Sequence, residues 1–195
     1  SRTRLAFQAP VFGDLDAALP VDDVPFAGKT ALLLVEGILI VVLEEMGRAL
    51  LGAPYFSTVV LAANTLLQSG DDAAKKAHLP GIAAGETIAT LAFTEPNGRW
   101  DESGIEATAT AAGDGWTISG TKMYVIDGHT ANLVIVAART AAGVSLFAVD
   151  GDAAGLTRTG LSTMDQTRKQ AKLELVDVPA TLIGTDGGGW DVLST

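Results

Sequence analysis

The chain has 195 residues, of which 48% are hydrophobic and 6% are aromatic, so it can bury the core of one large domain or two small ones. Its formal net charge of -10 argues against a nucleic-acid partner, because a polyanion would be repelled. It has no cysteine, and its histidines, His78 and His129, lie far apart, which excludes disulfides and argues against a metal site.

The first half of the chain is predicted to be mainly helical. Proline and glycine interrupt residues 1–30 too often for a long element. Residues 31–50 carry apolar side chains at three- and four-residue spacing, and a second apolar helix is expected at about residues 55–67. The most apolar run, residues 31–43, is too short to span a bilayer, which needs roughly 20 residues. We therefore expect a buried helix, no membrane partner and a cytoplasmic location.

A shorter helix is expected next. Ser69 can cap its N-terminus, and the helix is predicted to end near Leu79 and Pro80 because proline disfavours a helical residue before it. Acidic and basic side chains four residues apart support it, in the pairs Asp71 with Lys75 and Asp72 with Lys76.

From about residue 88 the hydrophobic period changes from helical to alternating. Strands are predicted at residues 106–112, 116–119, 123–126, 133–138, 144–149 and 171–178. No helical pattern separates them, so the fold class is α+β, with an N-terminal helical region followed by an antiparallel β-barrel or sandwich.

The expected domain organisation follows from these patterns. Residues 1–87 form an N-terminal helical domain, which we expect to be incomplete, and residues 88–186 form a middle β-barrel domain. Residues 187–195 read as a glycine hinge followed by the first turn of a further helical domain.

A series of short motifs identifies a family. Residues 78–86 (HLPGIAAGE) lead into residues 91–96 (LAFTEP), and residues 116–122 (WTISGTK) precede Asp127-Gly128. Each motif alone is weak, but the order and spacing from residue 44 to residue 189 resemble the acyl-CoA dehydrogenases. These enzymes use FAD to convert an acyl-CoA to its trans-2-enoyl thioester: a carboxylate removes the α proton and the β hydrogen passes to the flavin as hydride.

The resemblance implies partners and site residues. The partners are acyl-CoA, an electron-accepting flavoprotein and other dehydrogenase subunits in a homo- or hetero-oligomer, in fatty-acid or steroid degradation. Leu91, Phe93 and Thr94 would meet the isoalloxazine ring, with Thr94 bonded to its pyrimidine edge, while Tyr124 and Ile126 would flank its other side. For Glu95 we expect a structural role, as a carboxylate bound to backbone amides.

Some residues depart from the family pattern. Trp100 stands where a serine contacts the FAD pyrophosphate and lines the acyl-CoA entrance, and its indole could block the channel. Arg99 is assigned to a phosphate of the substrate or cofactor, with a solvated loop position as the alternative. Tyr124 replaces a tryptophan, and Ile126 replaces a threonine that donates to flavin N5. These changes predict weakened FAD binding.

The resemblance assigns no catalytic residue to this sequence. The family's catalytic glutamate lies in a C-terminal helical domain, and the sequence ends at Thr195. We therefore expect a flavin-dependent acyl-CoA dehydrogenase that is incomplete as given and inactive alone. The alternatives are a non-catalytic partner subunit of a heteromeric acyl-CoA dehydrogenase and a non-enzymic binding barrel that keeps the fold.

Overall fold

The computed structural model describes residues 39–195, and the chain divides into two compact units, residues 1–49 and 50–195. In the first unit, residues 39–48 are helical, as predicted, and Glu44 pairs with Arg48 at 2.9 Å on that helix. The irregular segment predicted for residues 1–30 and the first part of the apolar run, residues 31–38, lie outside the described residues. No helix in the described part is long and apolar enough to cross a membrane.

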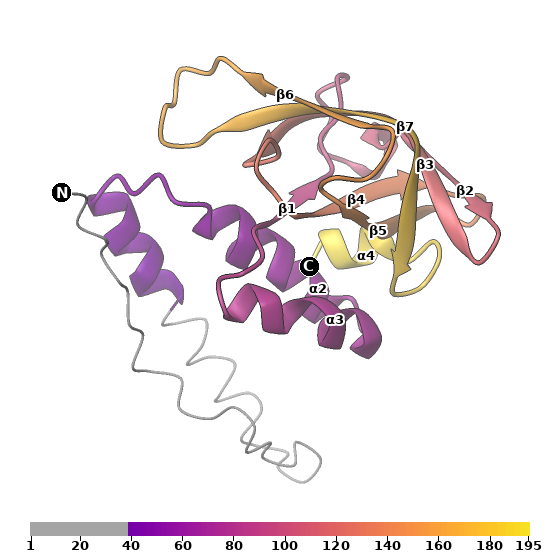
Figure 1. The fold of residues 1–195 in the computed structure, drawn as a ribbon, viewed down its shortest axis with the longest axis horizontal. Coiled ribbons are helices and arrows are strands. Elements are labelled where there is room, and N and C mark those ends of the chain that lie inside the picture. Colours follow the sequence, from indigo (N-terminus) through magenta and orange to yellow (C-terminus); the bar gives the residue numbers. More distant parts are fainter. Residues whose placement is uncertain (1–38) are drawn as a thin grey trace, which may run out of the picture. The chain divides into compact units, whose positions relative to one another are not determined.

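The second unit begins with helices that form one side of it (Figure 1). They are the π-helix η2 (Phe56–Ala63), α2 (Asn64–Gln68) and α3 (Asp72–Ala83). The N-terminal cap of α3 is Asp71 and not the predicted Ser69, since the Asp71 carboxylate accepts from Ala73 N and Ala74 N at 3.0 and 2.9 Å. The Ser69 hydroxyl instead donates to the Leu66 carbonyl at 2.7 Å and so completes α2.

The end predicted for α3 at Pro80 is wrong, because the helix continues to Ala83. Proline removes one amide donor, but the backbone carbonyls in the turn that follows still accept hydrogen bonds. Ala84 N donates to the Pro80 carbonyl at 2.9 Å, and the Gly81 carbonyl accepts from Glu86 N at 2.9 Å. The proline is therefore tolerated in the last turns of the helix.

The remainder of the unit is a seven-stranded sheet. Its strands are β1 (Ala89–Ala92), β2 (Thr108–Ala112), β3 (Gly115–Ile126), β4 (Leu133–Arg139), β5 (Val144–Asp150), β6 (Leu156–Leu161) and β7 (Gln170–Ile183), with the 3₁₀ turn η3 (Glu102–Gly104) before β2 and the helix α4 (Gly189–Leu193) at the end. The pairings β4–β2–β3–β7–β5–β4 return to their starting strand and close a barrel, which β1 extends along β4 and β6 extends along β7.

The predicted α+β barrel is thus confirmed, with a correction to strand direction. Most pairs are antiparallel, but β1 and β2 each run parallel to β4. The apolar strand β4 is buried on both faces: Val134 and Val136 point into the barrel core, while Leu133 and Ile135 join the core that faces the helices. Because both faces are buried, this strand lacks the alternation of apolar and polar residues that a strand with one exposed face shows.

The glycine segment after β7 is packed and is not a free hinge. Gly187 has a φ of +81°, and an added Cβ would lie 2.7 Å from the Ala142 carbonyl oxygen. A Cβ on Gly189 would lie 2.8 Å from the Cα of Ser145. Trp190 on α4 packs into the same core as the other helices. The proposed domain limits after residues 87 and 186 remain predictions.

Candidate functional site

A hollow of about 330 Å³ lies where the end of β1 meets the second half of β3, beside η2. We call it the β1–β3 pocket. Its lining residues are Leu61, Leu91, Phe93, Thr94, Trp100, Met123, Tyr124, Val125, Ile126 and Gln170. All the side chains assigned above to the flavin ring therefore lie around one pocket. Leu61, Met123 and Gln170 were not expected from the sequence, since no local pattern connects them to residues 91–94.

The two walls of the pocket are joined through the backbone. The Thr94 carbonyl accepts from Met123 N at 2.9 Å, just beyond the last residue of β1. The Thr90 hydroxyl donates to the Ile126 carbonyl at 2.6 Å. These two bonds connect the segment that contains Thr94 to the segment that contains Ile126.

A β-bulge sets the position of Tyr124. Lys122 pairs with Leu173 and Val125 pairs with Ala171, so β3 has one more residue than β7 in this interval. Tyr124 takes the left-handed conformation, with φ of 57°, and 54% of it is exposed. A bulky residue rarely adopts this conformation, and such strain is found preferentially at functional sites.

The residue after Ile126 connects this bulged strand to η2. Asp127 also has a positive φ, 55°, and its carboxylate accepts from the buried Ser57 hydroxyl at 2.7 Å. Leu61, on the same π-helix, also lines the pocket and forms a third wall. The bond between Ser57 and Asp127 therefore fixes this wall relative to β3. π-helical turns occur often at functional sites.

Trp100 lies at the pocket, whereas Arg99 does not. The rings of Trp100 and Phe93 meet edge-on, with centroids 5.9 Å apart and planes at 75°. The Arg99 guanidinium donates to the Ser103 hydroxyl at 3.1 Å, and its backbone N–H donates to Asn97 Oδ1 at 2.9 Å. Arg99 thus closes its own loop, and its role as a phosphate ligand remains a prediction.

A buried ion pair lies behind the pocket wall. Lys122 Nζ is 2.6 Å from Glu95 Oε1, and their side chains are 0% and 3% exposed. The Glu95 carboxylate also accepts from Glu106 N and Ala107 N, both at 3.0 Å, which confirms its predicted structural role. Burial lowers the pKa of Lys122 from its usual value near 10.5 to about 8, while the neighbouring Glu95 opposes that shift. In the sequence, Lys122 stands out only as the last residue of the WTISGTK motif.

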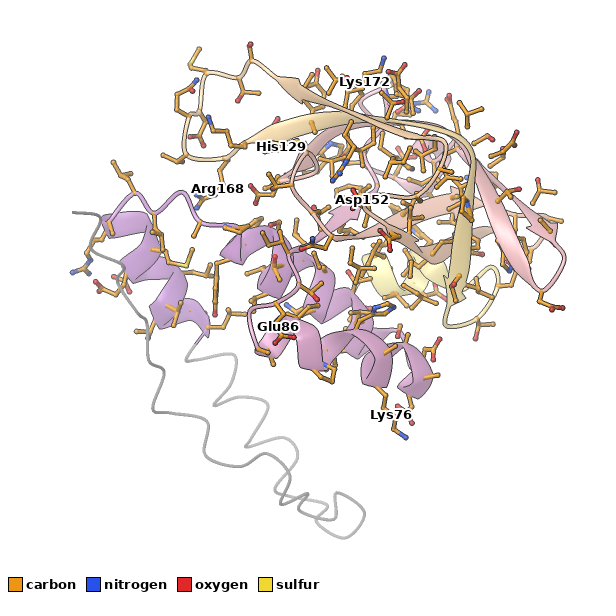
Figure 2. The ribbon with its side chains drawn as sticks, in the orientation of Figure 1. Lys76, Glu86, His129, Asp152, Arg168 and Lys172 are labelled. Atoms are coloured by element: carbon orange, nitrogen blue, oxygen red, sulfur yellow. The ribbon has the colours of Figure 1, made fainter. Side chains whose placement is uncertain are left out.

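Two larger hollows contain none of the predicted site residues. One, of about 570 Å³, lies between Trp116 and Pro179. The other, of about 440 Å³, lies between His129 and Arg158, and Asp152 also lines it (Figure 2). The Nδ1 of His129 is buried without a hydrogen-bond partner. Within residues 39–195, no group of three or more His, Asp or Glu side chains could hold a metal ion.

Comparisons with known proteins match the part of the chain that carries most of the pocket. The family model described as "Acyl-CoA dehydrogenase, middle domain" matches residues 90–178, which run from β1 into β7 and include both walls of the β1–β3 pocket. The short-chain-specific acyl-CoA dehydrogenase of Megasphaera elsdenii is 31% identical over 149 residues, which cover 70% of this chain and 38% of that protein. The chain spans less than half the length of the curated relatives that it matches.

Solved structures share the fold as well. An acyl-CoA dehydrogenase from Geobacillus kaustophilus superposes with a TM-score of 0.65 and 28% identity, over 71% of this chain and 41% of that one. A glutaryl-CoA dehydrogenase from Mycobacterium smegmatis, solved in complex with FADH2, gives a TM-score of 0.61 and 25% identity, over 67% and 36% of the two chains. With its motifs, its barrel and the match over residues 90–178, the chain contains a domain of the acyl-CoA dehydrogenase family.

Proposed function

We propose that this chain provides the isoalloxazine-binding part of a flavin-dependent acyl-CoA dehydrogenase, which forms the α,β double bond of an acyl-CoA thioester. The observation that carries the proposal is the β1–β3 pocket, which gathers Leu91, Phe93, Thr94, Tyr124 and Ile126 from two segments of the chain. Bound FAD would supply the acceptor for the hydride.

The lining of the pocket fits a flat aromatic ring. Its walls are mainly apolar or aromatic, and Thr94 and Gln170 add polar atoms that can bond to a ring edge. Phe93 and Tyr124 present aromatic surfaces, while Leu91 and Ile126 exclude water. No charged side chain is among the lining residues, so they suit the ring and not the phosphates of FAD.

The pocket residues can bind and orient, but they include no carboxylate. Glu95, the nearest acid in sequence to Thr94, is buried and already accepts bonds from Lys122 and from backbone amides. We therefore assign it no proton transfer. Under this proposal, a carboxylate from another domain or subunit removes the α proton of the thioester.

A non-catalytic partner subunit is the second candidate, and Trp100 favours it. The indole lies against Phe93 and lines the pocket, where it competes for space with a bound ring. Ile126, on the opposite wall, has no side-chain donor. Acyl-CoA, an electron-accepting flavoprotein, association with other dehydrogenase subunits and a cytoplasmic location belong to either form of the proposal.

Flavin titration separates the candidates. The purified chain is titrated with FAD, flavin fluorescence is followed, and the visible absorbance is read after desalting. Flavin that stays bound supports the dehydrogenase. A colourless chain that gains flavin and acyl-CoA oxidation only with a longer homologous subunit supports the partner subunit. A chain that binds no flavin in either setting would leave a non-enzymic barrel and sink the proposal.

A further inference from the structure

The Glu95–Lys122 ion pair contacts both segments that form the β1–β3 pocket. Glu95 directly follows the pocket residues Phe93 and Thr94, and Lys122 directly precedes Met123 and the bulge. Lys122 Nζ donates to Glu95 Oε1 at 2.6 Å and to the Phe93 carbonyl at 3.4 Å. Next to it, Met123 N donates to the Thr94 carbonyl at 2.9 Å. The consecutive residues 93, 94 and 95 are thus each bonded to residue 122 or 123.

We propose that Glu95 and Lys122 are positioning residues, which hold the Phe93–Thr94 wall at a fixed distance from the bulged Tyr124 wall and so keep the pocket ready for a planar ring. This inference rests on the proposed function, in that the planar ring is taken to be a flavin. It assigns the ion pair a role in the geometry of the site and no contact with the ligand.

Burial of the pair argues for such a specific role. Two charges removed from water cost free energy, and an apolar pair of similar volume is often equally stable or more stable. What an apolar pair could not supply is the set of directed bonds, since Glu95 also anchors Glu106 N and Ala107 N while Lys122 reaches the Phe93 carbonyl. Removal of one partner leaves the other buried and unpaired, and we expect the walls to separate there first.

The test measures amide hydrogen exchange in the full chain without ligand. The amide of Met123 reports on the wall, because it bonds to the Thr94 carbonyl. The amide of Gly151, which donates to the Asn132 carbonyl at 2.7 Å, reports on a remote part of the unit. We expect Lys122→Met to speed exchange at Met123 at least tenfold and to leave Gly151 within twofold, whereas equal acceleration at both amides, or none at either, overturns the proposal.

Matched variants keep the test decisive. Lys172→Met removes a lysine from the partly exposed Lys172–Glu174 pair, whose N–O distance is 2.8 Å, on the outer side of β7 (Figure 2), and it should leave Met123 unchanged. Acceleration at Met123 in this control would overturn the assignment. Glu95→Gln should reproduce the local effect of Lys122→Met. If both Glu95→Gln and Lys122→Met abolish folding, the pair is structural and the proposal fails.

Riboflavin binding gives a second, separate readout. It carries the ring system without the pyrophosphate or adenine of FAD. Lys122→Met should weaken riboflavin binding about tenfold at a temperature where both proteins are folded, and Lys172→Met should not change it. If the unaltered chain binds neither riboflavin nor FAD, alone or with a longer homologous subunit, the proposed function fails, while exchange at Met123 still decides the positioning role.

Discussion

The indole of Trp100 packs edge-on against Phe93 at a centroid distance of 5.9 Å, while 76% of Trp100 is exposed to solvent. Phe93 itself belongs to the wall of the β1–β3 pocket. Trp100 thus lines the pocket, makes an aromatic contact with Phe93 and belongs to neither hydrophobic core. A ring that enters the pocket must displace this contact or accommodate it.

Trp100→Ser should therefore tighten flavin binding. An edge-to-face aromatic pair is worth about 0.5–1.5 kcal/mol, so its removal should lower the FAD dissociation constant by up to roughly tenfold. Adding Ile126→Thr supplies a hydroxyl donor and should lower the constant further. FAD titration by fluorescence measures both effects.

A control for this series is Met164→Ser, since Met164 is fully exposed on the loop between β6 and β7. It also replaces a large apolar side chain by serine, but it lies outside the pocket lining. No change is expected in this variant. Unchanged or weaker binding in the Trp100→Ser protein would show that the indole supports the ring instead of obstructing it.

The backbone strain at Tyr124 gives a second prediction. Its φ of 57° costs an L-residue about 1–2 kcal/mol, and glycine avoids this cost. Tyr124→Gly should therefore be about 1 kcal/mol more stable to urea unfolding than Tyr124→Ala, which removes the same ring but keeps the strain. Both variants should weaken flavin binding. An alanine variant as stable as the glycine variant would show that the bulge relaxes.

The strands with strong hydrophobic signals were predicted within about one residue of their observed ends. The ranges 133–138 and 144–149 correspond to β4 (Leu133–Arg139) and β5 (Val144–Asp150). These strands are almost fully buried, so their composition alone separates them from turns. The order of helices before barrel was also predictable, because the hydrophobic period changes at about residue 88.

Elements that depend on distant partners were missed. The strand β6 (Leu156–Leu161) has the sequence LTRTGL, which lacks clear alternation, and it forms only along β7. The strand β3 (Gly115–Ile126) was predicted as two pieces. It is one continuous strand whose pairing with β7 shifts register at two places, after Ile118 and after Lys122. Sequence patterns do not show a bulge, since the extra residue is defined only by the neighbouring strand.

At the candidate site, too, some features were predictable from the sequence and others depended on distant partners. The resemblance named five ring contacts, and the structure brings all of them to the β1–β3 pocket. It did not indicate that Lys122 would be bonded to Glu95, because these residues are 27 positions apart and neither stands in a pattern that requires the other. Long-range pairing of this kind appears only once β1 and β3 are placed side by side.

Gly120 provides a third prediction, on stability. Its φ is +152°, and an added Cβ would lie 2.5 Å from the Cβ of Ala107. Gly120→Ala should destabilise the chain by about 2 kcal/mol or more, because Ala107 is held by its bond to Glu95 and cannot move freely. Urea unfolding gives the value.

Gly160→Ala in β6 is the matched control, since nothing lies within 4 Å of the Cβ that it adds. Its free energy of unfolding should stay within about 0.5 kcal/mol of the unaltered chain. A tolerated Gly120→Ala with unchanged urea midpoint would mean that β2 and β3 can separate at Ala107 without loss.

The pKa of Lys122 gives the last prediction. In the folded chain burial lowers this pKa to about 8, whereas the unfolded chain keeps a value near 10.5. Between these pH values the unfolded chain binds more protons, so the Lys122 contribution to stability rises with pH, by at most about 1.4 kcal/mol per pH unit. The unfolding free energy of the unaltered chain minus that of the Lys122→Met variant should therefore be constant below about pH 7 and should increase from pH 8 to pH 10. Urea titrations at each pH measure this difference, with Lys172→Met as the control for net charge. A difference that shrinks over this range would mean that the buried ammonium stabilises the fold and that Glu95 outweighs the cost of burial.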